Sequence, residues 1–186
     1  YTHQLAPGKH LINTEACIDA QIPVWKDDSW YWSKEAKDWG WTWAPADQKY
    51  LHPKYVPVFR YAGDIIGCLN NYVDGWIDWN MVLDKQGGPN WFKNWCIAPV
   101  IVDPENNEVY FTPLYYTMAH FSKFMRPGAV KIGCTINHKD LMATAVKNPD
   151  GTIALVIFNP TEQLKNVSIQ LNNLSKNISI SSKALQ

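Results

Sequence analysis

The sequence predicts an α/β unit followed by an all-β unit. Two short strands, residues 11–14 and 73–80, flank a helix whose apolar stripe runs from Tyr55 to Leu69. A strand, a helix and a second strand form a βαβ unit, in which the strands run parallel through a right-handed crossover. From Ala129 onward the pattern changes to short β segments separated by turns such as NHKD and NPDG.

The first strand carries a single carboxylate to its end. In the stretch HLINTEACIDA, residues 11–14 form the strand and Glu15 follows them. Residues 18–52 have no clean period and mix charges and proline with tryptophans at six positions: Trp25, Trp30, Trp32, Trp39, Trp41 and Trp43. We expect a long loop there, and its aromatic content argues against disorder.

The helix between the strands has one apolar face of period 3.6. That face consists of Tyr55, Val58, Phe59, Ala62, Ile65, Ile66 and Leu69. Pro57 lies in the first turn, where proline is tolerated. The carboxyl ends of parallel strands meet at one edge of an α/β sheet, where sites are built. Glu15 and Trp79 are therefore expected at the same edge.

After the second strand we expect a Gly-rich turn, LDKQGGPNW, and then a strand and hairpin in residues 96–113. A second helix begins at Pro113, with Thr112 as its N-cap. Its apolar face consists of Leu114, Met118, Phe121 and Met125. Two parallel strands and two helices do not close a sheet. The missing neighbours must come from another chain or from an earlier part of a longer protein.

Composition narrows the classes of function. The 186 residues carry no net charge, so nothing in them points to nucleic acid or an anionic membrane as a partner. No apolar run reaches the roughly 18 residues that a membrane helix needs. The four cysteines form no CxxC pair and the histidines are scattered, so we expect neither a metal site nor a cofactor.

Glu15 has two readings. It can be a surface residue that caps the next segment, or a catalytic carboxylate. Sugar hydrolysis needs two carboxyl groups, one to attack the anomeric carbon and one to protonate the leaving oxygen. No second carboxylate is as well placed, because strand alternation puts Asp78 on the face opposite Trp79, where it more naturally anchors structure.

Aromatic residues surround the second strand and its loop. Trp76 and Trp95 suit a core, whereas Trp79 and Trp91 lie where sugars can stack on indole. Asparagines nearby can donate to sugar hydroxyls, at positions Asn80, Asn90 and Asn94. Cys17 lacks a basic partner in the sequence, so a buried thiol fits it better than a nucleophile.

Four stretches of the sequence are distinctive: TEAC, GWIDWNMVLDKQGGPNW, PVIVDPENNEVYFTPLYYTMAHFSKFMRPG and NPDGTIALVIFNP. They resemble the C-terminal part of glycoside hydrolase family 30, the glucosylceramidase group, in its bacterial type. The likeness runs from about Leu11 to Asn159, and the ordered GGPNW and HFSKF blocks make it specific.

This resemblance implies a retaining β-glycosidase built on a (β/α)8 TIM barrel with an attached β-sandwich. Residues 1–128 would be the last two βα units of the barrel, and residues 129–186 would be sandwich strands. Glu15 would be the nucleophile, Trp79 and Asn94 would hold the sugar, and Cys17 would line the pocket. The substrate would be a β-glucoside or a glucosylceramide-like lipid.

One departure from the family pattern decides what this chain can do alone. The acid/base glutamate of the family lies in an Asn-Glu-Pro block, and the sequence contains none. The remainder of the barrel would supply it, so these 186 residues alone are expected to be inactive. A non-catalytic carbohydrate-binding module is the alternative. The aglycone and the compartment (secreted, periplasmic or cytoplasmic) stay open.

Overall fold

The computed structural model describes residues 1–16, 56–84, 88 and 98–186. The chain divides into two compact units. One comprises Tyr1–Tyr61 with Tyr72–Tyr116, and the other comprises Ala62–Asn71 with Thr117–Gln186. The predicted loop 18–52 lies outside the described residues. The domain boundary between residues 128 and 129 stays a prediction.

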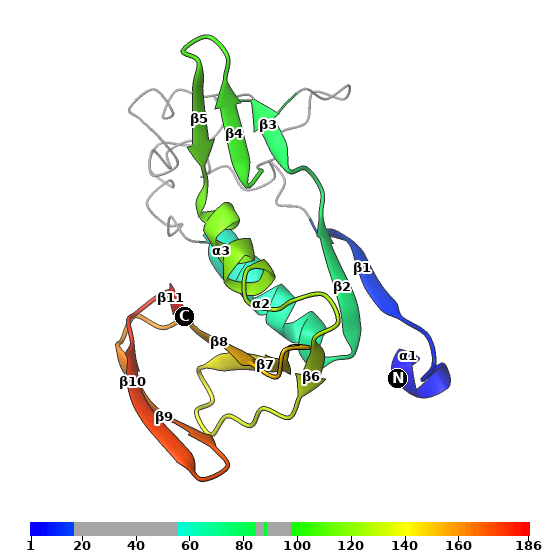
Figure 1. The fold of residues 1–186 in the computed structure, drawn as a ribbon. Helices are drawn as coiled ribbons and strands as arrows, with labels where there is room; N and C mark the ends of the chain where they lie inside the picture. The colour runs from blue at the N-terminus through cyan, green and yellow to red at the C-terminus, as the bar shows by residue number, and fades with distance from the viewer. Residues whose placement is uncertain (17–55, 85–87, 89–97) are drawn as a thin grey trace. The chain divides into compact units, whose positions relative to one another are not determined.

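The first unit contains the predicted pair of parallel strands (Figure 1). A short helix α1 (Thr2–Leu5) precedes β1 (Leu11–Ala16), which pairs in parallel with β2 (Val73–Asp78). Helix α2 (Val56–Asn70) separates the two strands in sequence, so the predicted strand–helix–strand order is confirmed.

Helix α2 forms where the apolar period predicted it. Ala62, Ile65 and Ile66 of the predicted stripe are at most 5% exposed, and Tyr61 beside them is 2% exposed. The helix ends at Asn70, and the following Asn71 donates from its side-chain amide to the carbonyl of Gly67 at 2.8 Å. This bond satisfies one of the carbonyls that a helix end leaves without a partner.

A second sheet of the first unit has the order β3-β4-β5. Strand β3 (Val82–Asp84) runs parallel to β4 (Val100–Asp103), which forms an antiparallel hairpin with β5 (Glu108–Phe111). The hairpin was expected, whereas β3 was not. A three-residue strand before a Gly-rich turn is too short to show a period of two.

Helix α3 (Pro113–Ser122) begins at the predicted proline but ends three residues before Met125. The backbone N–H of Met125 still reaches the carbonyl of Phe121 at 2.8 Å, so the last turn continues outside the regular helix. The Thr112 hydroxyl donates to the carbonyls of Ala98 and Pro99, at 2.9 and 3.1 Å. It therefore holds the chain before β4 against the start of the helix.

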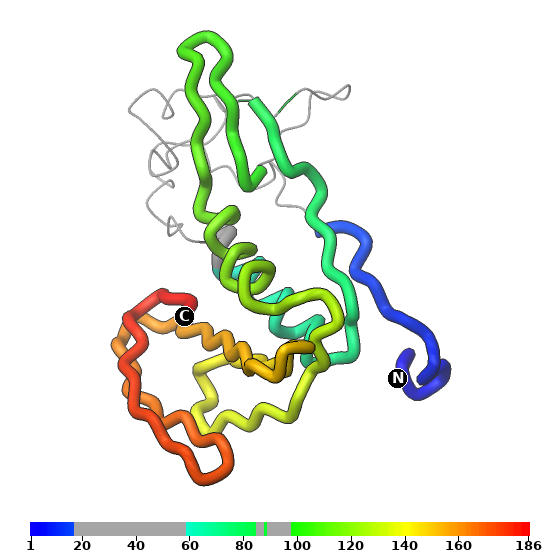
Figure 2. Tube along the Cα trace, viewed as in Figure 1, coloured from blue at the N-terminus to red at the C-terminus, as the bar shows by residue number. Residues whose placement is uncertain are grey.

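The second unit contains two antiparallel β layers. One is a sheet of order β11-β8-β7-β6, formed by β6 (Val130–Ile132), β7 (Met142–Lys147), β8 (Ile153–Asn159) and β11 (Ala184–Leu185). The other is the hairpin of β9 (Lys165–Leu171) and β10 (Leu174–Ile180), whose trace can be followed in Figure 2. Their core contains Ala143, Ile157 and Ile180, with Val167 and Ile169 of β9 packed against it.

Asn159 joins the ends of these two layers. It is fully buried, and its amide nitrogen donates to the carbonyls of Gln163 and Ser181, both at 2.8 Å. Its oxygen accepts from the backbone N–H of Thr161 at 3.1 Å and from the Thr161 hydroxyl at 2.8 Å. One side chain thus fixes the end of β8, the start of the hairpin and the segment after it.

Candidate active site

The candidate site lies at the carboxyl ends of β1 and β2, where the sequence places Glu15 and Trp79. Glu15 is the penultimate residue of β1 and is exposed, and Trp79 directly follows β2 and is 54% exposed. The backbone N–H of Trp79 donates to the carbonyl of Ala16 at 2.8 Å. The two predicted site residues are therefore held at the same end of the strand pair, as parallel pairing requires.

A register shift at Glu15 determines which face its side chain takes. Asn13 pairs with Trp76 and Ala16 pairs with Asp78, so two residues of β1, Thr14 and Glu15, stand opposite the single residue Ile77. Such a bulge changes the direction of the side chains in the bulged strand. In a regular strand Glu15 would share the face of Asn13.

The exposure of the residues follows the shifted register. Asn13, Ala16, Trp76 and Asp78 are all partly buried, which marks one face of the pair. Thr14, Glu15, Ile77 and Trp79 are exposed and mark the other. The bulge thus assigns Glu15 to the face that carries the Trp79 indole.

A second shift on β2 compensates for the first. Leu11 pairs with Val73 but Ile12 pairs with Gly75, so Asp74 is an extra residue on β2. The Asp74 carboxylate accepts from the Leu11 backbone N–H at 3.3 Å and contacts His10 Nδ1 at 3.0 Å. Each strand carries one extra residue, and the pairing of Ala16 with Asp78 is restored.

Asp78 is on the face opposite Trp79, as alternation predicted. Its Oδ1 accepts from the Tyr61 hydroxyl and from the Trp79 backbone N–H, the latter at 2.8 Å. Its Oδ2 is buried and has no hydrogen-bond partner among the described residues. Burial raises the pKa of the Asp78 carboxyl, and the hydrogen bonds from Tyr61 and Trp79 offset part of that rise.

Sequence reasoning missed Tyr61, which lies beside the predicted apolar stripe of α2. Its ring packs edge-on against Trp76, with 5.0 Å between ring centroids and an interplanar angle of 72°. A buried tyrosine usually finds a partner for its hydroxyl. A tyrosine next to a helical apolar stripe, with an aspartate at a nearby strand end, was the available signal.

Three predicted site residues, Cys17, Trp91 and Asn94, lie outside the described residues. Within the part of the chain that the structure describes, no group of three or more His, Cys, Asp or Glu side chains could hold a metal ion. No helix among the described residues is long and apolar enough to span a membrane.

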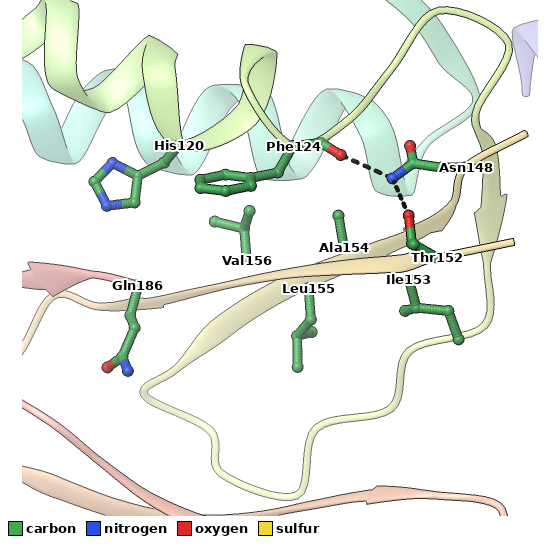
Figure 3. Close-up of a pocket in the computed structure, with 9 residues that line it drawn as sticks. All are labelled: His120, Phe124, Asn148, Thr152, Ile153, Ala154, Leu155, Val156 and Gln186. Carbon is green, nitrogen blue, oxygen red and sulfur yellow. Dashed lines mark hydrogen bonds between the residues drawn. The ribbon is translucent and has the colours of Figure 1, made fainter. Parts of the chain in front are cut away.

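The second unit has a cavity of about 440 Å³ between the C-terminal turn of α3 and β8 (Figure 3). Val156 and Ala154 point toward Phe124, while Leu155 and Ile153 point to the other side of β8. Asn148 at its edge donates to the Phe124 carbonyl at 2.9 Å and to the Thr152 hydroxyl at 3.0 Å. Its oxygen accepts from the Arg126 backbone N–H at 2.9 Å, so the amide is engaged in structure.

Two family models match the chain, and together they match more than half of it. The model described as the glycosyl hydrolase family 30 TIM-barrel domain matches residues 44–125. The model described as the glycosyl hydrolase family 30 beta sandwich domain matches residues 128–186. The predicted fold class, a portion of a (β/α)8 barrel followed by β-sandwich strands, is therefore confirmed.

Individual proteins show the same likeness. A Caenorhabditis elegans protein provisionally named glucosylceramidase 4 is 36% identical over 88% of this chain and 27% of its own length. The lysosomal acid glucosylceramidase of Mus musculus is 30% identical over 87% of this chain and 27% of its own length. The chain thus spans about a quarter of the length of these relatives.

A solved structure agrees in fold. SrfJ from Salmonella typhimurium superposes with a TM-score of 0.77 over 98% of this chain and 35% of its own, at 24% sequence identity. The family models, the relatives and this superposition coincide with the motifs that first suggested the resemblance. The chain belongs to glycosyl hydrolase family 30.

Proposed function

We propose that the complete polypeptide carrying this sequence is a retaining β-glycosidase of the glucosylceramidase type, with Glu15 as its nucleophile. The observation that supports this most directly is the common face of Glu15 and Trp79 at the carboxyl ends of β1 and β2. An exposed carboxylate on the same face of the strand pair as an exposed indole suits a sugar that stacks on the ring while its anomeric carbon meets the carboxylate.

In the proposed reaction the Glu15 carboxylate attacks the anomeric carbon of a β-glucoside and forms a covalent glycosyl-enzyme. A second carboxyl group protonates the departing oxygen and then activates the water that releases the sugar. In retaining enzymes the two carboxyl groups are about 5–5.5 Å apart. The second group is expected from the remainder of the barrel, because the sequence contains no Asn-Glu-Pro block.

The sugar-binding roles follow the resemblance. Trp79 is proposed to form the platform for the sugar, with Trp91 as a further stacking surface. Asn94 is proposed as a hydrogen-bond donor to a sugar hydroxyl, and Cys17 as part of the pocket wall. A glucosylceramide-like lipid is the proposed substrate, since both relatives carry glucosylceramidase in their names.

Covalent labelling tests the proposal. The complete polypeptide is incubated with a 2-fluoro-glucoside, which forms a slowly hydrolysed glycosyl-enzyme, and the labelled peptide is identified by mass spectrometry. We expect the label on Glu15 and none in a Glu15→Gln variant. Glu108→Gln is the matched control, because Glu108 is an exposed glutamate on β5.

The outcomes separate the candidates. Label on another carboxylate would refute the assignment of Glu15. Binding of a β-glucan by the complete polypeptide, with neither labelling nor turnover, would replace the enzyme with the non-catalytic carbohydrate-binding alternative.

A further inference from the structure

Tyr61 contacts two residues of β2 that lie on the face opposite Trp79. The tyrosine is 2% exposed, its ring packs edge-on against Trp76, and its hydroxyl donates to Oδ1 of Asp78. The hydrogen bond and the ring contact together fix the last residues of β2 to this position of α2.

Asp78 passes this constraint to the backbone of the next residue. The oxygen that accepts from Tyr61 also accepts from the Trp79 backbone N–H at 2.8 Å. The same N–H lies 2.8 Å from the carbonyl oxygen of Ala16 and is shared between the two acceptors. A shared N–H holds its residue in a narrow range of orientations, because both acceptors restrict the same peptide group.

The contacts therefore form a continuous chain from a buried helix residue to the first strand. It runs from the Tyr61 hydroxyl to the Asp78 carboxylate, to the Trp79 N–H and to the Ala16 carbonyl. Ala16 directly follows Glu15, and Trp79 carries the proposed sugar platform. This series of hydrogen bonds therefore reaches the backbone next to both proposed site residues, while Tyr61 and Asp78 contribute no group to the site itself.

We propose that Tyr61 and Asp78 are positioning residues, which hold the Trp79 indole and the Glu15 carboxylate in register with each other across the ends of β2 and β1. This inference rests on the proposed function, since it assigns the two residues a role in that reaction. Displacing a reacting group by about 1 Å can cost about 100-fold in rate even when the changed residue is remote from the chemistry.

The Tyr61→Phe variant isolates the hydrogen bond, because it keeps the ring against Trp76 and removes only the donor to Asp78. The rate of labelling by the 2-fluoro-glucoside and its final stoichiometry are measured separately in the complete polypeptide. Stoichiometry counts the folded, competent sites, whereas the rate per competent site reports their geometry. We expect stoichiometry near that of the wild type and a labelling rate lower by about 10- to 100-fold.

Tyr110→Phe is the matched control. Tyr110 also donates its hydroxyl to a carboxylate, that of Glu108, but on the β4–β5 hairpin. Its removal should leave both the rate and the stoichiometry unchanged. A purely structural role for Tyr61 would reduce the stoichiometry and leave the rate per competent site unaltered, which would overturn the proposal.

Variants of Asp78 keep the test decisive if Tyr61→Phe fails to fold. Asp78→Asn retains an oxygen that can accept from Tyr61 and Trp79, so its labelling rate should stay within a few-fold of the wild type. Asp78→Leu removes the oxygen that accepts from both Tyr61 and Trp79, and its labelling rate should fall about 100-fold. Equal rates for these two variants would reject the positioning role.

The same experiment tells the two proposals apart. If the wild type is labelled at Glu15 and Tyr61→Phe reacts at the wild-type rate, the positioning role fails while the nucleophile assignment stands. If the wild type carries no label at Glu15, the proposed function fails and the positioning role falls with it.

Discussion

The backbone N–H of Trp79 lies 2.8 Å from the carbonyl oxygen of Ala16, so the residue after β2 is bound to the residue that follows Glu15. This link uses main-chain atoms only. Changes to the indole itself should therefore leave the strand ends in place, and they can be read as changes in what the side chain contacts.

Replacing Trp79 with alanine should weaken substrate binding by the complete polypeptide. The lost interaction is stacking on an exposed indole, so we expect KM for an aryl β-glucoside to rise about tenfold, equivalent to about 1.4 kcal/mol, with a smaller change in kcat. Steady-state kinetics provide the measurement. Tyr116→Ala, which removes a 56% exposed aromatic side chain from α3, is the control. An unchanged KM in Trp79→Ala would contradict the platform role.

Asp78 should make folding stability depend on pH in a predictable direction. Burial raises its pKa above the usual value of 3.8. Between 3.8 and the raised pKa the native state holds a proton that the unfolded chain has released. The stability contribution is therefore fully present below 3.8 and is lost as pH rises through the raised pKa. Asp78→Asn, which cannot titrate, should gain stability relative to the wild type as pH rises, measured by urea unfolding at several pH values.

Asp150 provides a control of opposite sign for that experiment. Hydrogen bonds from the Thr152 hydroxyl and backbone lower the pKa of this carboxyl. Its contribution should be present at neutral pH and lost as pH falls through the lowered pKa. Asp150→Asn should therefore be less stable than the wild type at neutral pH and approach wild-type stability in acid. Asp78→Asn should be more stable than the wild type at higher pH, and this difference should disappear in acid. The same pH trend in both variants would contradict the opposite pKa shifts of Asp78 and Asp150.

Removing the Asn159 amide should destabilise the second unit. Asn159→Ala removes a fully buried amide together with its hydrogen bonds to the Gln163 and Ser181 carbonyls and to the Thr161 N–H, and each such bond contributes about 0.5–1.5 kcal/mol. We expect the free energy of unfolding to fall by about 2–4 kcal/mol in urea denaturation. Asn166→Ala, at an exposed position of β9, should change it by less than about 0.5 kcal/mol. Similar losses of unfolding free energy at both positions would show that the Asn159 hydrogen bonds add no more stability than an exposed asparagine does.

The isolated 186-residue chain should show no turnover of a β-glucoside, because the proposed mechanism needs two carboxyl groups and the acid/base group is expected from the remainder of the barrel. An aryl β-glucoside assay compares this chain with the complete polypeptide at equal molar concentration. Turnover by the isolated chain would show that both carboxyl groups lie within these residues.

Much of the fold followed from local patterns. The stripe containing Ala62, Ile65 and Ile66 predicted α2, and Pro113 marked the start of α3. Periodicity and proline act over a few residues, so they can be read from one sequence. The end of α3 was predicted too late, because the turn containing Met125 keeps a helical hydrogen bond after the regular helix has ended.

Local patterns could not predict which face of the strand pair Glu15 takes. That face depends on two residues of β1 pairing with one residue of β2, and the sequence of one strand does not specify its register with its partner. The Tyr61–Asp78 hydrogen bond joins residues 17 positions apart, and it too appears only when the helix and strand are placed together. Local sequence therefore indicated the candidate residues, while pairing determined their arrangement.

The extra residues Asp74 and Thr14 have a consequence for comparing sequences across the family. An insertion in one strand is cancelled by an insertion in its neighbour, so alignment gaps at these two places should occur together. A relative that lacked only one of them would have every later strand partner slipped by one position. Coupled gaps at these two places should therefore identify homologues that share this strand-end geometry, even where the intervening residues have diverged.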